Sequence, residues 1–274
     1  MYLRPQSKTF RRKSKLVKLV NFAKSGRYSA PRLAEIFKCN KKTVLLVLGD
    51  NGIRLRNLGQ FQKRIFCDDI FFDELTPISS YWLGFIAADG CLSLKNRSVT
   101  INLALKDKSH LQKFKRAIRA NSDISYSLST NSVRISVYSE KVFDRLVNLG
   151  VTPNKSLTIG KVEVPQNLLS HFVRGVFDGD GSVSGRRVTH LQFMIAGNKP
   201  FLKNIQESLI TNCDINEVQL YQLSGNNKAF KLQYTGSQIF RIMEYLYRDS
   251  DFKIRLTRKY EKYLKLRNKF LKNC

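Results

Sequence analysis

The stretch WLGFIAADG at residues 82–90 returns, with substitutions, as VRGVFDGDG at residues 173–181. Each copy is an apolar run that carries a glycine, a small residue four places later, and then Asp-Gly. The two terminal acids, Asp89 and Asp180, lie 91 residues apart. A repeated motif in matching context indicates that one structural unit occurs twice in the chain.

Small residues at positions i and i+4 leave a bare strip on one face of a helix, here Gly84 with Ala88 and Gly175 with Gly179. Two such strips allow two helix backbones to come into close contact. The pairing predicts that Asp89 and Asp180 lie side by side at two helix C-termini, which are already partly negative. Gly90 and Gly181 are expected in the left-handed conformation just past each helix end.

Two neighbouring carboxylates repel each other, so they either share a proton or recruit a cation. Hard oxygen ligands next to a phosphate select Mg²⁺. A divalent ion held between Asp89, Asp180 and a scissile phosphate would activate a water and stabilise the leaving oxygen. The pair is therefore predicted to hydrolyse phosphodiester bonds.

The overall charge agrees with a nucleic-acid partner. The 274 residues include 48 Lys and Arg against 21 Asp and Glu, a formal net charge of +27. Such a charge repels itself unless a polyanion neutralises it. The five cysteines are scattered without a Cys-x-x-Cys pair, which argues against structural zinc and favours an intracellular compartment, either cytoplasm and nucleoid or an organelle matrix. No apolar run approaches the length of a membrane span.

The N-terminal part is expected to be a small helical DNA-binding domain at residues 1–56. Helical spacing of apolar residues predicts three helices, the last over residues 41–50 with Val44, Leu45, Val47 and Leu48 buried. This order is typical of a helix-turn-helix, in which the start of the last helix contacts DNA. The candidate contacts are Lys41, Lys42 and Thr43, followed by Arg54 and Arg56. Residues 57–77 are interpreted as a basic, aromatic linker that also touches DNA.

Beyond the linker, period-two alternation predicts strands and helical spacing predicts helices in the same order twice. The expected class is α+β, with a duplicated helix–strand–strand–helix–strand–strand–helix core. The first subdomain is placed at residues 78–165, and the second, which ends in a basic helix, at residues 166–274.

The paired motifs resemble the LAGLIDADG signature of homing endonucleases in the single-chain, two-motif form. The resemblance implies a saddle of two αββαββα units and Mg²⁺-dependent cleavage of both strands of a long, asymmetric DNA target by a monomer, with Mn²⁺ or Ca²⁺ able to replace Mg²⁺. It makes Asp89 and Asp180 the metal ligands, assisted by the backbone carbonyls of Ala88 and Gly179. It also places basic residues near the metals: Lys155, and either Arg258 or Lys259.

Two departures from the signature stand out. Ala87 occupies the position of the motif's first acid, which the second copy keeps as Asp178. Leu83 and Arg174 replace a small residue, which implies a less regular helix contact.

Within this resemblance, the polar strand faces would enter the major groove, where base pairs are distinguishable. The candidate readers are Thr100, Asn102, Ser132, Arg134, Ser136 and Tyr138 in the first half, and Arg186, Arg187, His190, Gln192, Gln219, Tyr221, Lys231 and Gln233 in the second.

Three functions compete. The first is a site-specific double-strand DNA endonuclease of the intron-homing kind. The second is a maturase that binds its own intron RNA on the same scaffold. The third is a catalytically silent DNA-binding regulator, for which the helix-turn-helix is suggestive. Retention of both Asp89 and Asp180 argues against the third, because a pure binder gains nothing from paired acids beside phosphates.

Overall fold

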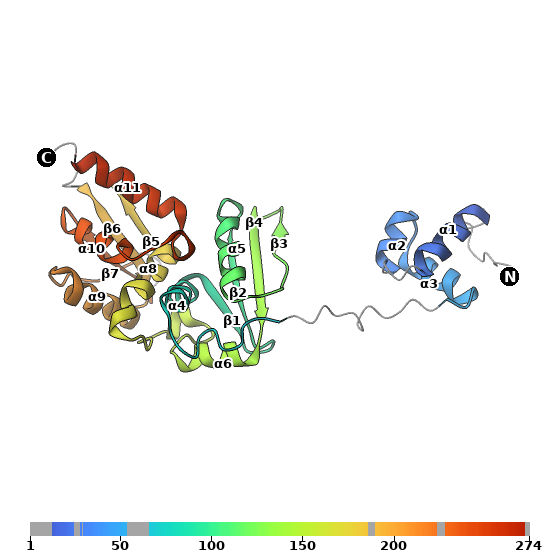
Figure 1. Cartoon of the computed structure of the whole chain (residues 1–274), viewed down its shortest axis with the longest axis horizontal. Helices are drawn as coiled ribbons and strands as arrows, with labels where there is room; N and C mark the ends of the chain where they lie inside the picture. Colours follow the sequence, from blue (N-terminus) through green and yellow to red (C-terminus); the bar gives the residue numbers. More distant parts are fainter. Residues whose placement is uncertain are drawn as a thin grey trace. The chain divides into compact units, whose positions relative to one another are not determined.

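The computed structural model describes residues 13–24, 28, 30–53, 66–185, 190–223 and 228–271. The chain divides into two compact units, Met1–Arg64 and Ile65–Cys274 (Figure 1). Each is described by itself below.

The smaller unit contains helices α1 (Lys13–Lys24), α2 (Ala30–Ile36) and α3 (Lys41–Asp50) in its described part. Asn40 caps α3, because its side chain accepts a hydrogen bond from the Thr43 backbone N–H at 2.7 Å. Val44, Val47 and Leu48 are buried as expected, whereas Leu45 is 46% exposed. The prediction for Leu45 was wrong because a helix that packs on one side buries only one stripe of its surface.

The larger unit repeats one order of elements. The first half contains α4 (Pro77–Asp89), β1 (Gly90–Ser93), β2 (Ser98–Ala104), α5 (Lys108–Ala117), β3 (Ser125–Ser127), β4 (Ser132–Tyr138), α6 (Glu140–Asn148) and the short α7 (Lys155–Thr158). The second half contains α8 (Leu169–Asp180), β5 (Gly181–Ser184), β6 (Gln192–Gly197), α9 (Lys199–Cys213), β7 (Tyr221–Gln222), β8 (Phe230–Thr235), α10 (Gln238–Tyr247) and α11 (Thr257–Leu271). The predicted α+β class and the duplicated αββαββα order are confirmed.

Each half forms an antiparallel sheet with the same topology, β1-β2-β4-β3 and β5-β6-β8-β7. The alternation in the sequence gives each sheet one apolar and one polar face. In the first sheet, Val99, Ile101 and Val137 are at most 1% exposed and lie on the face toward the core. Helices α5 and α6 contact β2 on that side. The opposite face carries the polar residues.

Helices α4 and α8 lie side by side in the middle of the larger unit (Figure 1). A Cβ built on Gly84 would lie 2.0 Å from the Phe172 carbonyl oxygen, and one on Gly175 would lie 2.0 Å from the Tyr81 carbonyl oxygen. Only glycine fits at these two positions, so the predicted backbone-to-backbone contact is present.

Gly90 and Gly181 follow the two helices for a different reason than expected. Their φ angles are −75° and −90°, so neither is left-handed. A Cβ on Gly90 would instead lie 2.6 Å from the Ile86 carbonyl oxygen, and one on Gly181 would lie 2.3 Å from the Phe177 ring. The glycines let each chain leave its helix directly into a strand without a steric clash.

Residues 66–76, which the sequence assigned to the linker, pack on the first half, and residues 57–65 lie outside the described residues. Phe72 is 1% exposed, and its carbonyl oxygen accepts a hydrogen bond from Arg145 at 3.0 Å. Thr76 and Ser79 form a capping box at the start of α4. This segment therefore belongs to the fold of the larger unit.

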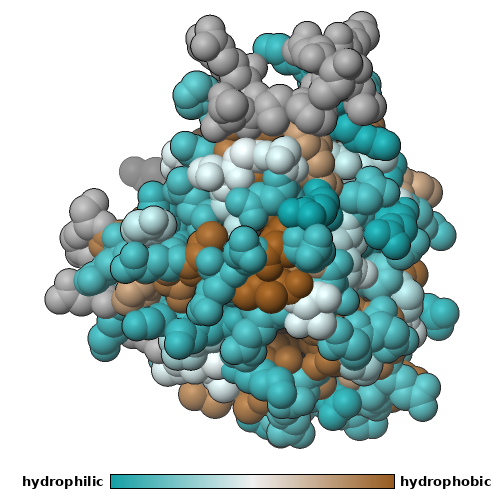
Figure 2. Space-filling view, turned by 90° about the vertical axis from the view of Figure 1, so that its left-hand side faces the viewer, coloured by the Kyte–Doolittle hydropathy of each residue, from teal (hydrophilic) through white to brown (hydrophobic). Residues whose placement is uncertain are grey.

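Within the described ranges, no helix is long and apolar enough to cross a membrane. In Figure 2, hydrophilic residues cover most of the visible face, and apolar residues form small areas between them.

Candidate active site at the ends of the paired helices

Asp89 and Asp180 are the last residues of α4 and α8, so the helix pair brings the two motif acids to the same end of the packed helices. A Cβ built on Gly179 would lie 2.4 Å from the Ala88 Cβ and 3.6 Å from the Asp89 Cγ. The second helix therefore ends directly against the first acid. Both aspartates keep exposed surface.

The electrostatics of the pair follow from this crowding. Partial loss of hydration, followed by the negative charge of Asp180, raises the pKa of Asp89 to about 6. Burial also raises the pKa of Asp180, while Lys155 and Lys259 oppose the rise. Positive side chains only partly offset the cost of holding two carboxylates together, so the site favours an added cation.

A lysine binds the end of each helix. Lys155 donates a hydrogen bond to the Ala88 carbonyl oxygen. Lys259 donates to the carbonyl oxygens of Phe177 at 2.7 Å, Gly179 at 3.1 Å and Gly181 at 2.6 Å. Ala88 and Gly179 are the residues that precede the two aspartates, so the lysines occupy equivalent places in the two halves. They are called the Lys155 site and the Lys259 site below.

The two sites differ in depth. Lys259 is 8% exposed, and its three ammonium hydrogens match its three carbonyl acceptors. Burial lowers the pKa of Lys259 to about 8, although Asp178, Asp89 and Asp180 favour its charged form. Lys155 is only partly buried, and burial also lowers its pKa.

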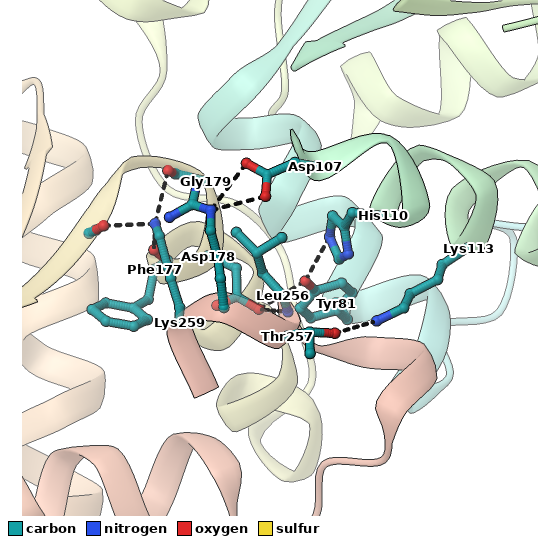
Figure 3. Close-up of polar contacts among 12 residues, drawn as sticks. Tyr81, Asp107, His110, Lys113, Phe177, Asp178, Gly179, Leu256, Thr257 and Lys259 are labelled. Carbon is teal, nitrogen blue, oxygen red and sulfur yellow. Dashed lines mark hydrogen bonds and ion pairs between the residues drawn. The ribbon is translucent and has the colours of Figure 1, made fainter. Parts of the chain in front are cut away.

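The sequence left open whether Arg258 or Lys259 faces the acids. In the structure, Lys259 binds the carbonyls at the end of α8. Arg258 Nε donates to Asp107 at 2.9 and 3.0 Å from the two carboxylate oxygens, although the positive charges of Lys259 and Arg258 both act to lower the pKa of Asp89. Arg258 thus joins α11 to the first half of the unit (Figure 3).

Asp178 directly precedes Gly179, whose carbonyl oxygen binds Lys259, and is 1% exposed. Its Oδ1 accepts a hydrogen bond from the Tyr247 hydroxyl at 2.7 Å. Its Oδ2 accepts from the Tyr81 hydroxyl at 2.8 Å and from the Leu256 backbone N–H at 2.7 Å. Because the Tyr81 hydroxyl proton goes to Asp178, His110 Nε2 donates to the Tyr81 oxygen across 2.9 Å (Figure 3).

Arg174 was expected to make the contact between α4 and α8 less regular, but its side chain does not separate the two helices. It is fully buried, and its guanidinium donates to the carbonyl oxygens of Ile254 at 2.7 Å and Leu246 at 2.6 Å. Its third contact is His171 Nδ1 at 2.7 Å. The guanidinium also lies over the Tyr81 ring of α4, 5.5 Å from the ring centroid, so Arg174 contacts α4 as well as the segment that leads into α11.

The predicted base readers of the first half share the polar face of their sheet. Strand register pairs Thr100 with Ser136 and Asn102 with Arg134, and Ser132 and Tyr138 lie at the two ends of β4. The hydroxyls of Thr100 and Ser136 lie 2.8 Å apart. The six residues therefore form one continuous polar surface.

The second half gathers fewer of its predicted readers. Gln192, Tyr221, Lys231 and Gln233 lie on strands of its sheet, on the face opposite Phe193 and Leu232. Gln219 precedes β7, which covers only Tyr221–Gln222, and is therefore not in a strand. His190 lies just before β6.

In the smaller unit, Lys41 and Lys42 are exposed at the start of α3, and the Thr43 hydroxyl donates to Asn40 at 2.9 Å. Arg54, Arg56, Arg186 and Arg187 lie outside the described residues.

Sequence reasoning missed the residues that support Lys259: Tyr81, Asp107, His110, Lys113 and Tyr247. One signal was present, because Tyr81 and Asp178 carry polar groups inside the two motif helices, next to apolar residues of the motif. A buried polar group requires a partner. Nothing in the local pattern identifies that partner, which for this pair lies 97 residues away.

The comparisons with known proteins concern the fold. No family model matches the chain, and no curated protein matches it. Among solved structures, the N-terminal LAGLIDADG domain of WhiA is 22% identical with a TM-score of 0.46 and covers 68% of this chain and 91% of its own. Full-length WhiA from Thermatoga maritima is 20% identical with a TM-score of 0.47, over 70% of this chain and 64% of its own. The I-LtrWI LAGLIDADG homing endonuclease bound to target DNA is 16% identical with a TM-score of 0.47, over 72% of this chain and 91% of its own.

Proposed function

We propose that this chain is a site-specific endonuclease that uses divalent metal to cut both strands of a long, asymmetric DNA target. One observation carries the proposal: two helices in backbone contact end together in Asp89 and Asp180, and a lysine binds the end of each helix. Two acids and two lysines in pseudo-twofold arrangement suit two phosphodiester bonds on opposite strands.

The donor set fits a hard divalent cation. Asp89 and Asp180 would supply carboxylate oxygens. The carbonyls of Ala88 and Gly179 each accept a hydrogen bond from a lysine, so the second lone pair of each would be the one that binds the cation. Loss of hydration, followed by the charge of Asp180, raises the pKa of Asp89, and a bound cation would favour its charged form. When bound, Mg²⁺ would supply an activated water and stabilise the leaving oxygen.

The protein groups have separate tasks. The aspartates hold negative charge at the metal site, and Lys155 and Lys259 place positive charge where negative charge develops on the phosphate in the transition state. The polar faces of the two sheets supply donors and acceptors for base edges. Both acids come from one chain, so a monomer provides the whole site.

Cleavage after selection tests the proposal. A library of randomised duplexes is incubated with the protein and Mg²⁺, and cut ends are recovered and sequenced. Asp89→Asn and Asp180→Asn should lower cleavage of a recovered site by a factor of at least about 10³, since they remove charge at the reacting centre. DNA affinity should stay within about threefold, because base and phosphate contacts lie elsewhere.

Asp214→Asn is the matched control. Asp214 is exposed in the left-handed region at φ 49°, which asparagine tolerates. It should cleave as the wild type does. Cleavage that persists in both motif variants would overturn the proposal. Absence of cleavage together with tight binding of its intron RNA would favour the maturase, and tight DNA binding alone would favour the regulator.

A further inference from the structure

Two charged residues of the second motif copy have apolar counterparts in the first. Arg174 corresponds to Leu83, and Asp178 corresponds to Ala87. Both charged side chains are at most 1% exposed. Burying a charge is costly unless it is fully hydrogen-bonded, so the bonds that these side chains form indicate their role.

Both residues bind the segment that leads into α11. Asp178 accepts the Leu256 N–H at 2.7 Å, and Arg174 donates to the Ile254 carbonyl at 2.7 Å. Leu256 is the residue just before α11, and its own carbonyl accepts the N–H of Lys259 at 3.0 Å and that of Tyr260 at 3.2 Å. Asp178 therefore fixes the first turn of the helix that carries Lys259. A carboxylate at this position also faces the positive end of the helix dipole.

Side chains of the first half also bind the segment that leads into α11. Lys113 donates to the Arg255 carbonyl at 2.9 Å and contacts the Thr257 hydroxyl at 3.3 Å. Asp107 binds Arg258, and the Tyr81 hydroxyl joins Asp178 (Figure 3). The Lys259 site is thus held from both halves.

The Lys155 site is built differently. Lys155 lies on α7, a helix of four residues, and the position equivalent to Asp178 is Ala87, which has no hydrogen-bonding side chain. The carbonyl of Ile159, just after α7, accepts a bond from Asn198 at 2.8 Å. The two lysines are thus related by the pseudo-twofold, but the hydrogen bonds that hold the segments carrying them differ.

We propose that Asp178 is a positioning residue for Lys259, so that the two DNA strands are cut at sites with separate structural support. This inference rests on the proposed endonuclease function. Removing the Asp178 carboxylate should release the first turn of α11 and slow the bond served by Lys259, while the bond served by Lys155 is still cut. The expected product is DNA nicked in one defined strand.

Asp178→Ala gives the second copy the residue that the first copy already has. A duplex with a selected site carries a different fluorophore on each strand, and single-turnover rates are measured for both strands. Lys259→Met and Lys155→Met identify which strand each site serves. Asp178→Ala should slow cleavage of the DNA strand that Lys259 serves, called the Lys259 strand, about 10- to 100-fold, as expected for a reacting group displaced by about 1 Å. Cleavage of the other strand should slow less than about threefold.

Asp178→Asn is the conservative variant, because its amide oxygen can still accept the Leu256 N–H. It should restore most of the cleavage rate on the Lys259 strand. If Asp178→Ala folds poorly, Asp178→Asn still allows the two strand rates to be compared. Asp214→Asn, in the same half, should leave the ratio of the two strand rates unchanged. General destabilisation would slow both strands alike, so equal slowing, or no change in Asp178→Ala, would overturn the inference.

Hydrogen exchange of the free protein gives a readout that needs neither DNA nor metal. In Asp178→Ala, amides 259–262 at the start of α11 should exchange at least about tenfold faster, while amides of α4 stay protected. Unchanged exchange in that turn would overturn the positioning role even if the wild type cut no DNA. If the wild type cuts DNA and Asp178→Ala slows both strands equally, the endonuclease function stands and only this inference is overturned.

Discussion

At the residue scale, the site concentrates unfavourable charge. Asp89 titrates at about 6 rather than at its ordinary value because it has lost hydration and faces Asp180. A carboxyl whose pKa is raised by folding stabilises the fold while it is protonated. That stabilisation is complete below the unfolded pKa and is lost as the pH rises through about 6.

Asp89→Asn should therefore raise the melting temperature of the metal-free protein at pH 8, where the wild-type carboxylate is charged. At pH 4, where the wild-type group is protonated, the two proteins should melt together. Thermal unfolding without divalent cations at the two pH values checks this sign. A variant that is less stable than the wild type at pH 8 would contradict the electrostatic account.

The pH dependence of cleavage should have two limbs. Asp89 must be ionised, so kcat/KM should rise through about pH 6, and Lys259 must be protonated, so it should fall above about pH 8. Higher Mg²⁺ should move the acid limb to lower pH, because the ion favours the carboxylate.

Lys259→Met should lower kcat on its strand by about 10²- to 10³-fold and remove the alkaline limb. Lys203→Met, at an exposed position of α9, is the control and should keep both limbs. An alkaline limb that survives in Lys259→Met would assign it to another group.

At the element scale, the α4–α8 contact determines the distance between the acids. It depends on Gly84 and Gly175, where a methyl group would meet backbone oxygen at 2.0 Å. Backbone atoms of a buried helix cannot move aside as the end of a flexible side chain can, so the helices would have to separate.

Gly84→Ala should lower the free energy of unfolding by about 3 kcal/mol, the upper part of the range for overpacked cores. It should also slow cleavage of both strands, because both acids move. Gly160→Ala is the matched control, since a Cβ there meets nothing within 4 Å. Denaturant unfolding of the two variants gives the comparison, and equal stability would refute the close helix contact.

At the scale of the whole molecule, charge is divided between the two units. Residues 1–64 carry 17 Lys and Arg against two acidic residues, about half of the net +27. Each phosphate contact contributes about 0.9 to the slope of log affinity against log salt concentration. The smaller unit is therefore expected to contribute to affinity, and the larger unit to contain the chemistry.

A chain that starts at residue 65 should bind DNA more weakly and with a shallower salt dependence, but should still cut a selected site at saturating concentration. Fluorescence anisotropy at several salt concentrations measures the slope, and single-turnover cleavage measures the rate. An unchanged slope would show that the N-terminal helices do not contact the backbone of DNA.

The sequence by itself determined the duplication, the α+β order, the position of Asp89 and Asp180 at two helix ends, and the polar sheet face of the first half. These features are local: spacing of four residues defines a helix strip, and spacing of two defines a strand face. The exit conformation of Gly90 was not foreseen, because its constraint comes from contact with Ile86 rather than from a turn type.

Only the tertiary structure decided that Lys259 rather than Arg258 binds the carbonyls at the end of α8, and that Asp178 anchors the helix that carries it. Those contacts join segments about 80 residues apart. Consecutive residues of a helix differ by about 100° around its axis, so a rotation of α11 by that angle would exchange the two basic side chains. Sequence spacing fixes which residues share a face of an element, whereas the docking of that element fixes what the face meets.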